Sequence, residues 1–112
     1  MNGLRLLMIG MVIGMASVWG CSQEIGDECG SNADCGSDRL CDTSQPGGYC
    51  TVSPCTDDTC PSEAVCVKFA PQVSYCMKIC YDDTHCRKGY VCVKGYEGMS
   101  DAFCNQVLPT TP

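Results

Sequence analysis

The sequence predicts a small disulfide-rich fold, mostly irregular with short β-hairpins, built as a tandem array of three four-cysteine units. Three observations predict it. Thirteen of the 112 residues are cysteine, twelve of these recur at a regular spacing, and large apolar side chains are scarce beyond residue 20. Such a chain cannot bury much core, so disulfide cross-links have to supply the stability that a core would otherwise give.

Residues 1–20 have the pattern of an export signal peptide. The first five residues carry one positive charge, at Arg5, and Leu6 to Trp19 are almost wholly apolar or small. This run is shorter than the roughly 20 apolar residues that span a bilayer, and its order is typical of a secretory signal. Disulfides persist only in oxidising compartments, which agrees with export. A retained membrane anchor is the alternative interpretation.

The twelve cysteines that follow Cys21 fall into three groups of four with similar spacing. Their first members recur after 26 and 25 residues, a period typical of an array of similar units. An aliphatic residue precedes each third cysteine and an aromatic residue precedes each fourth. The units are residues 29–50, with Cys29, Cys35, Cys41 and Cys50; residues 55–76, with Cys55, Cys60, Cys66 and Cys76; and residues 80–104, with Cys80, Cys86, Cys92 and Cys104.

Each unit is expected to combine a polar loop with a β-hairpin. The loop lies between the first two cysteines, and the hairpin between the third and fourth. The first hairpin has the turn Gln45-Pro46-Gly47-Gly48. The later two have β-prone arms at 64–69 with 73–77 and at 90–93 with 102–106. Residues beside the hairpin cysteines are expected to pack on the disulfides. The short linkers force neighbouring units to touch, which predicts a rod-like array.

Four cysteines allow three pairings within a unit, and the sequence alone cannot choose among them. We favour first with third and second with fourth, because this ties both loops to the hairpin without joining its neighbouring arms. Bonds between units are a further alternative. The favoured pairs are Cys29–Cys41, Cys35–Cys50, Cys55–Cys66, Cys60–Cys76, Cys80–Cys92 and Cys86–Cys104.

The spacing C-x5-C-x5-C, followed later by an aromatic residue and cysteine, resembles cysteine-rich modules of the Dickkopf N-terminal type. It is also similar to the colipase-like scaffold, whose early pairing has the same interleaved form. The resemblance covers residues 29–104 and implies a scaffold rather than an activity. The chain lacks the adjacent cysteine pair that is typical of colipase-like modules.

Cys21 is left over from the repeat, and the segment Val18-Trp19-Gly20-Cys21 resembles the lipobox of bacterial lipoproteins. Trp19 departs from that pattern, which prefers a smaller residue. The resemblance implies that the Cys21 sulfur receives diacylglycerol, that cleavage occurs just before it, and that residues 21–28 form a lipidated tether. Ser22, in place of Asp, implies transfer to the outer membrane. The alternative is a secreted protein in which Cys21 forms an intermolecular disulfide.

Other chemistries find little support in the sequence. The formal net charge of −6 argues against binding to nucleic acid and favours basic partners. No C-x2-C spacing suggests a zinc site, so the only expected addition is the lipid on Cys21. The single histidine, His85, has no G-x-S-x-G nucleophile to serve and is expected to occupy a variable loop position. The acidic pairs 57/58 and 82/83 do not match a calcium loop, and 105–112 are expected to form a flexible tail.

These observations predict a non-catalytic, lipid-anchored protein of the bacterial cell envelope, acting as a protein-interaction or structural surface module. Its expected partners are the membrane, through the anchor, and a protein or surface ligand that the sequence does not identify. A secreted disulfide-rich effector, such as a protease inhibitor or a toxin-like ligand, is the alternative function.

Overall fold

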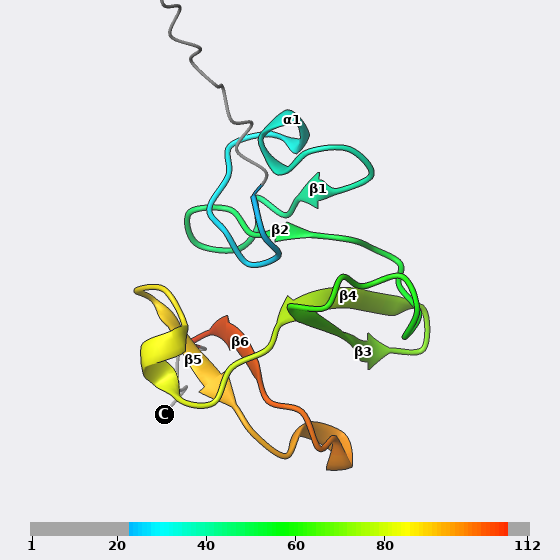
Figure 1. Ribbon diagram of the computed structural model, residues 1–112, viewed down its shortest axis with the longest axis vertical. Helices are drawn as coiled ribbons and strands as arrows, with labels where there is room; N and C mark the ends of the chain where they lie inside the picture. Colours follow the sequence, from blue (N-terminus) through cyan, green and yellow to red (C-terminus); the bar gives the residue numbers. More distant parts are fainter. Residues whose placement is uncertain (1–22, 108–112) are drawn as a thin grey trace, which may run out of the picture.

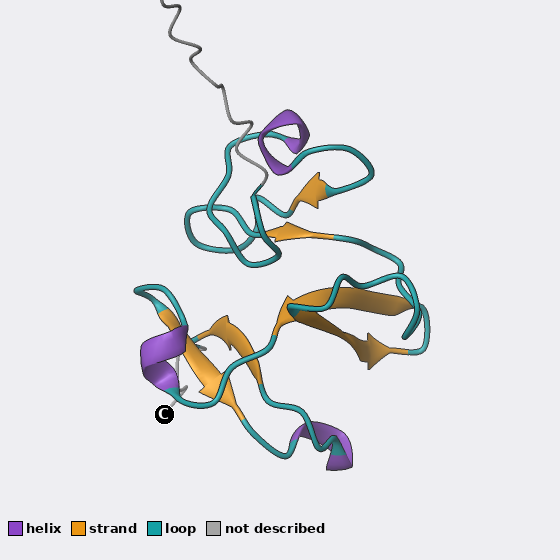
Figure 2. Cartoon of the chain, viewed as in Figure 1, coloured by secondary structure: helices purple, strands orange, loops and turns teal. Residues whose placement is uncertain are grey.

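Three antiparallel hairpins form where the repeat predicts them. The computed structural model describes residues 23–107, and each hairpin is a separate two-stranded sheet (Figures 1 and 2). The β-prone arms therefore pair locally, with strand ends close to those expected. The strands are β1 (Leu40–Cys41) with β2 (Cys50–Thr51), β3 (Ala64–Ala70) with β4 (Val73–Lys78), and β5 (Tyr90–Val93) with β6 (Phe103–Gln106).

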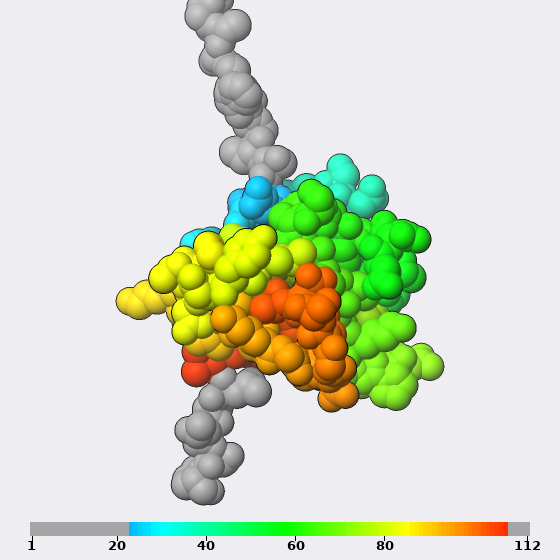
Figure 3. All heavy atoms as spheres, turned by 60° about the horizontal axis from the view of Figure 1, so that its bottom comes forward, coloured from blue at the N-terminus to red at the C-terminus, as the bar shows by residue number. Residues whose placement is uncertain are grey.

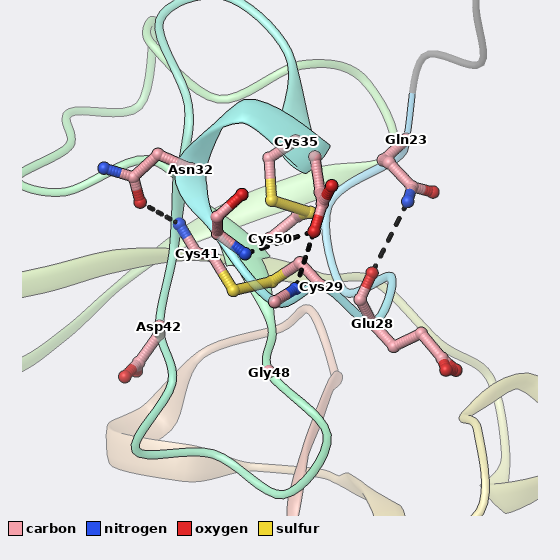
Figure 4. The surroundings of a disulfide bond; sticks show 12 residues. Gln23, Glu28, Cys29, Asn32, Cys35, Cys41, Asp42, Gly48 and Cys50 are labelled. Atoms are coloured by element: carbon pink, nitrogen blue, oxygen red, sulfur yellow. Dashed lines mark hydrogen bonds between the residues drawn. A yellow bond between two sulfur atoms is a disulfide. The ribbon is translucent and has the colours of Figure 1, made fainter.

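The twelve cysteines of residues 29–104 form six disulfides, all within units. The third and fourth cysteines of each unit lie opposite each other across the hairpin, yet each bonds to the loop that precedes the hairpin. Figure 4 shows the two crossed bonds of the first unit. The arrangement is the interleaved one favoured above. The bonds are Cys29–Cys41, Cys35–Cys50, Cys55–Cys66, Cys60–Cys76, Cys80–Cys92 and Cys86–Cys104.

The segments expected as plain polar loops contain single helical turns. In the first unit this turn is α1 (Asn32–Cys35), and in the third it is the 3-10 turn η1 (Asp83–His85). A second 3-10 turn, η2 (Tyr96–Gly98), lies in the loop between β5 and β6. One helical turn is enough to place the second cysteine beside the hairpin. A helix this short leaves no apolar periodicity in the sequence, which is why the sequence did not predict it.

The turn of the first hairpin depends on Gly48. Its backbone has φ of +77°, and a Cβ built there would lie 2.0 Å from the carbonyl oxygen of Cys29. The glycine lets the turn pass directly over the first cysteine of its own unit, which draws the loop and the hairpin together. The sequence prediction of a Pro-Gly turn here is confirmed, but this close approach could not be read from it.

The three units close on one another instead of forming a rod. The hydroxyl of Tyr49, in the first unit, donates a hydrogen bond of 3.0 Å to the carbonyl of Cys104 in the third. The Cys76 amide, in the second unit, donates at 3.0 Å to the carbonyl of Val52, in the linker that follows the first unit. Figure 3 shows the segments of all three units in one continuous body. The expected rod is therefore wrong: short linkers bring neighbours together but do not align them.

A shared core lies where the units meet. Its large side chains are at most 5% exposed and belong to one cluster, which draws on all three units and on the segment before the first. Burying a side chain of this size stabilises a fold by about 1.5–3 kcal/mol. Of the aromatics preceding each fourth cysteine, Tyr49 and Phe103 are buried and Tyr75 is half-buried. The core side chains are Ile25, Tyr49, Val67, Met77, Tyr90 and Phe103.

Both ends of the cysteine region continue into ordered structure. Ile25, expected in the tether, is fully buried, and Gly26 pairs through its amide with the Cys50 carbonyl at 2.9 Å. At the other end, Asn105 and Gln106, expected in the flexible tail, belong to β6. Residues 23–28 thus form part of the folded body. The predicted signal peptide, Cys21 and the end of the tail lie outside the described residues.

Candidate functional site

His85 has a structural role in the third unit. Its Nδ1 accepts hydrogen bonds from the backbone amides of Tyr81, at 3.1 Å, and Asp82, at 3.3 Å. Asp34 occupies the same repeat position in the first unit and accepts from two amides at 2.7 and 3.1 Å. Thr59, in the second unit, accepts from one at 2.8 Å. Three different side chains thus perform the same capping, and what they share is a hydrogen-bond acceptor.

The acidic pair 82/83 also serves the loop of the third unit. Asp82 accepts from the amide and hydroxyl of Thr84, and these hydrogen bonds lower the pKa of its carboxyl group. Asp83 accepts from the amide of Cys92 at 2.9 Å. These carboxylates therefore hold backbone amides in place, whereas Asp57 and Asp58 are exposed on the second unit.

Sulfur atoms crowd together in each unit, since the two disulfides cross. In every unit three of the sulfurs lie within 4.8 Å of one another. All of them are bonded to another sulfur, and the thiolate is the form of cysteine that binds metal. In this oxidised state the clusters brace the units and offer no thiolate ligand.

Arg87 joins the third unit to the first. Its guanidinium donates to the carbonyls of Gly26 and Gly48 and, at 2.9 Å, to that of Pro46. It also lies over the ring of Tyr90, with Cζ 4.6 Å from the ring centroid. The planar fork of an arginine spreads its donors over two terminal nitrogens in a fixed geometry, whereas a lysine ammonium is a compact point charge. Nothing in the sequence points to this contact.

Tyr49 stands at the junction of all three units. Besides donating to Cys104, its hydroxyl accepts from the Lys78 amide at 2.9 Å. Burial raises the pKa of Tyr49 well above its ordinary value, because the charged phenolate would lose its hydration. The side chain thus remains protonated and keeps both hydrogen bonds over a wide pH range.

A cavity of about 240 Å³ opens beside Tyr49, and all three units line it. The first unit contributes Asp42 and Gln45, the hairpin of the second contributes Phe69 and Tyr75, and β6 contributes Asn105. The lining therefore combines polar side chains with aromatic ones. No motif predicted it, because its lining comes from positions far apart in the chain.

Gln45, one of the residues that line this cavity, has an unpaired side-chain oxygen. Its side-chain oxygen Oε1 is buried and has no hydrogen-bond partner among the described residues. Buried polar atoms are normally paired, so such an atom calls for a donor from water or a ligand. Cavity and unpaired acceptor together make this junction, named here the inter-unit cavity, the best candidate for a binding site in residues 23–107.

Comparison with known proteins returned no relative: neither a protein-family model nor a curated protein nor a solved structure matches the chain. None of the short helical turns in residues 23–107 has the length or apolar character needed to span a bilayer.

Proposed function

We propose that the protein is a lipid-anchored module of the bacterial outer membrane that binds another protein without catalysing a reaction. One observation carries the proposal: all twelve cysteines of residues 29–104 bond to one another. None of them is available to Cys21, the thirteenth cysteine, which directly follows Val18-Trp19-Gly20. Acylation would consume this thiol, which could otherwise attack the six disulfides.

The docked N-terminal segment supports a membrane-facing orientation. The Arg39 guanidinium donates to the Gln23 carbonyl at 2.6 Å, and the Ile25 amide donates to the Glu63 carboxylate at 3.2 Å. Only Ser22 separates Cys21 from this fixed segment, and two residues extend by about 7 Å at most. Two or three acyl chains on Cys21 would thus hold the first unit against the headgroups. The rest of the body would then be available to a partner.

The rigid frame supports a binding role. Twelve paired sulfurs hold short loops in fixed positions, so a partner that contacts them loses little free energy to ordering them. His85, the single histidine, accepts backbone amides through Nδ1, and the acids beside it also cap the loop. These contacts give His85 and the neighbouring carboxylates a structural role, although residues of these types could otherwise suggest catalysis.

Intact-mass analysis of the protein from the producing cells tests the anchor. We expect cleavage before Cys21, the added mass of a diacylglyceryl thioether with or without an N-acyl chain, and twelve alkylatable thiols only after reduction. A matched Cys21→Ser variant should lack the lipid mass and leave the membrane fraction while keeping all six disulfides. An unacylated N-terminus, with Cys21 in an intermolecular disulfide, would contradict the proposal and favour the secreted effector.

A further inference from the structure

We propose that the inter-unit cavity receives the side chain of a lysine from a protein partner. The proposal rests on the binding role above and names the chemistry of the partner. The cavity, at about 240 Å³, is smaller than the roughly 300–1,000 Å³ typical of small-molecule pockets. A space of this size suits one long side chain, and the question is which one its lining would select.

The polar lining favours a cationic group. Asp42 is the only charged residue that lines the cavity. Its Oδ1 accepts from the amide and hydroxyl of Ser44, at 3.0 and 2.6 Å, which fixes the carboxylate. Among residues 23–107 no group donates to its Oδ2. This oxygen is a charged acceptor, and an ammonium group offers three donors. The Oε1 of Gln45 is buried, so the Gln45 amide would have to turn toward the cavity to accept from the same group.

The aromatic lining favours an aliphatic stem that ends in a cation. Tyr49, Phe69 and Tyr75 are among the residues that line the cavity. Ring faces attract cations through their quadrupole, and apolar rings gain by covering methylene groups. Lysine supplies four methylenes and an ammonium, so its two parts match the two kinds of lining residue. Arg87 does not line the cavity, and its guanidinium is held by carbonyls of the first unit.

The acidity of the whole chain adds to this local preference. A formal charge of −6 attracts basic partners and speeds their association. A free alkylamine has the same chemistry as a lysine side chain, but it lacks the flanking backbone that could contact the rim of the cavity. A single lysine offers little area, so the isolated residue should bind weakly and a peptide more tightly.

The test is a ¹H–¹⁵N NMR titration of the exported, oxidised protein. The first probe is N-acetyl-lysine methylamide. The second, N-acetyl-norleucine methylamide, has a similar aliphatic stem without the ammonium group. The third, n-butylamine, has the ammonium group but no peptide backbone. We expect the lysine probe to shift amides of residues 42–45 and 105–106, and norleucine to leave them unchanged. Equal shifts with norleucine, or no shift with lysine, would overturn the proposal. Tighter binding of butylamine than of the lysine probe would overturn the choice of a protein partner.

Two variants locate the effect. Asp42→Asn keeps an oxygen for Ser44 but removes the charge, and it should weaken lysine binding about tenfold, as expected for loss of a charge-assisted hydrogen bond. Asp38→Asn is the matched control, since Asp38 is exposed in the same unit, outside the cavity, and has φ of +60°, which Asn tolerates. Equal weakening by both variants would show only a general charge effect and refute the site.

A second cavity variant guards against a folding defect in the first. Gln45→Met keeps the length of the side chain and removes the buried acceptor, so lysine binding should weaken while thermal stability is retained. Unchanged lysine binding in Gln45→Met would contradict the assigned contact. The outcomes are separable from those of the anchor. An unmodified Cys21 with intact lysine binding would refute the anchor alone, and an acylated Cys21 without lysine binding would refute this inference alone.

Discussion

The hydroxyl of Tyr49 gives the sharpest test of how the units are held together. Tyr49→Phe removes one oxygen and leaves the ring in the core. The buried carbonyl of Cys104 and the amide of Lys78 then lose their partner. Each hydrogen bond contributes about 0.5–1.5 kcal/mol net, so the free energy of unfolding should fall by about 1–3 kcal/mol. With a guanidinium m-value of about 4 kcal/mol/M, the unfolding midpoint should fall by about 0.5 M.

The assay is guanidinium unfolding of the oxidised protein, followed by near-ultraviolet circular dichroism. Tyr75→Phe is the matched control, because Tyr75 has the same repeat position in the second unit and its hydroxyl has no partner among the described residues. Phe103 occupies that position in the third unit. If Tyr49→Phe is no more destabilising than Tyr75→Phe, the units are not joined by this hydroxyl.

The same side chain predicts a loss of stability in alkali. Burial raises the pKa of Tyr49 in the folded state, so the folded protein keeps a proton that the unfolded chain releases above about pH 10. The stability is therefore full below that pH and declines as the pH rises above it. Tyr49→Phe should flatten this decline between pH 9 and 11. The pKa of Tyr90 is also raised, by burial, so a smaller decline should remain. An equal slope in both proteins would refute the reasoning.

Three further changes test individual contacts. Arg87→Lys loses the planar fork that reaches the first unit and should lower the free energy of unfolding by about 1–3 kcal/mol, whereas the exposed neighbour Lys88→Ala should have little effect in the same denaturation assay. Gly48→Ala drives a methyl group into a backbone carbonyl, so peptide mapping after refolding should find little protein with all six native disulfides. Gly30→Ala meets no such clash and should refold normally. His85→Ala should cost about 1 kcal/mol, as loss of a cap does, and His85→Asp should recover most of it; failure of the aspartate to restore stability would argue against the capping role.

The repeat made much of the local structure predictable. Cysteine spacing and β-prone arms locate all three hairpins, since a hairpin is set by residues close in sequence. The interleaved pairing could be favoured over its rivals but could not be proved, because four cysteines in one small unit are all near one another. The differing residue types at His85, Thr59 and Asp34 suggest a variable loop position, yet each of them offers a hydrogen-bond acceptor, and this shared property was the usable signal of the cap.

By itself, the sequence determined the number of units and the places of their hairpins, because both follow from the cysteine spacing and from residues close together in the chain. Only the tertiary structure decided how the units close on each other. Tyr49, Arg87 and Ile25 make contacts between segments that are 38–61 residues apart, and such contacts leave no period in the chain. The inter-unit cavity follows from that closure, because its lining residues come from separate segments of the chain and meet only when all three units are packed.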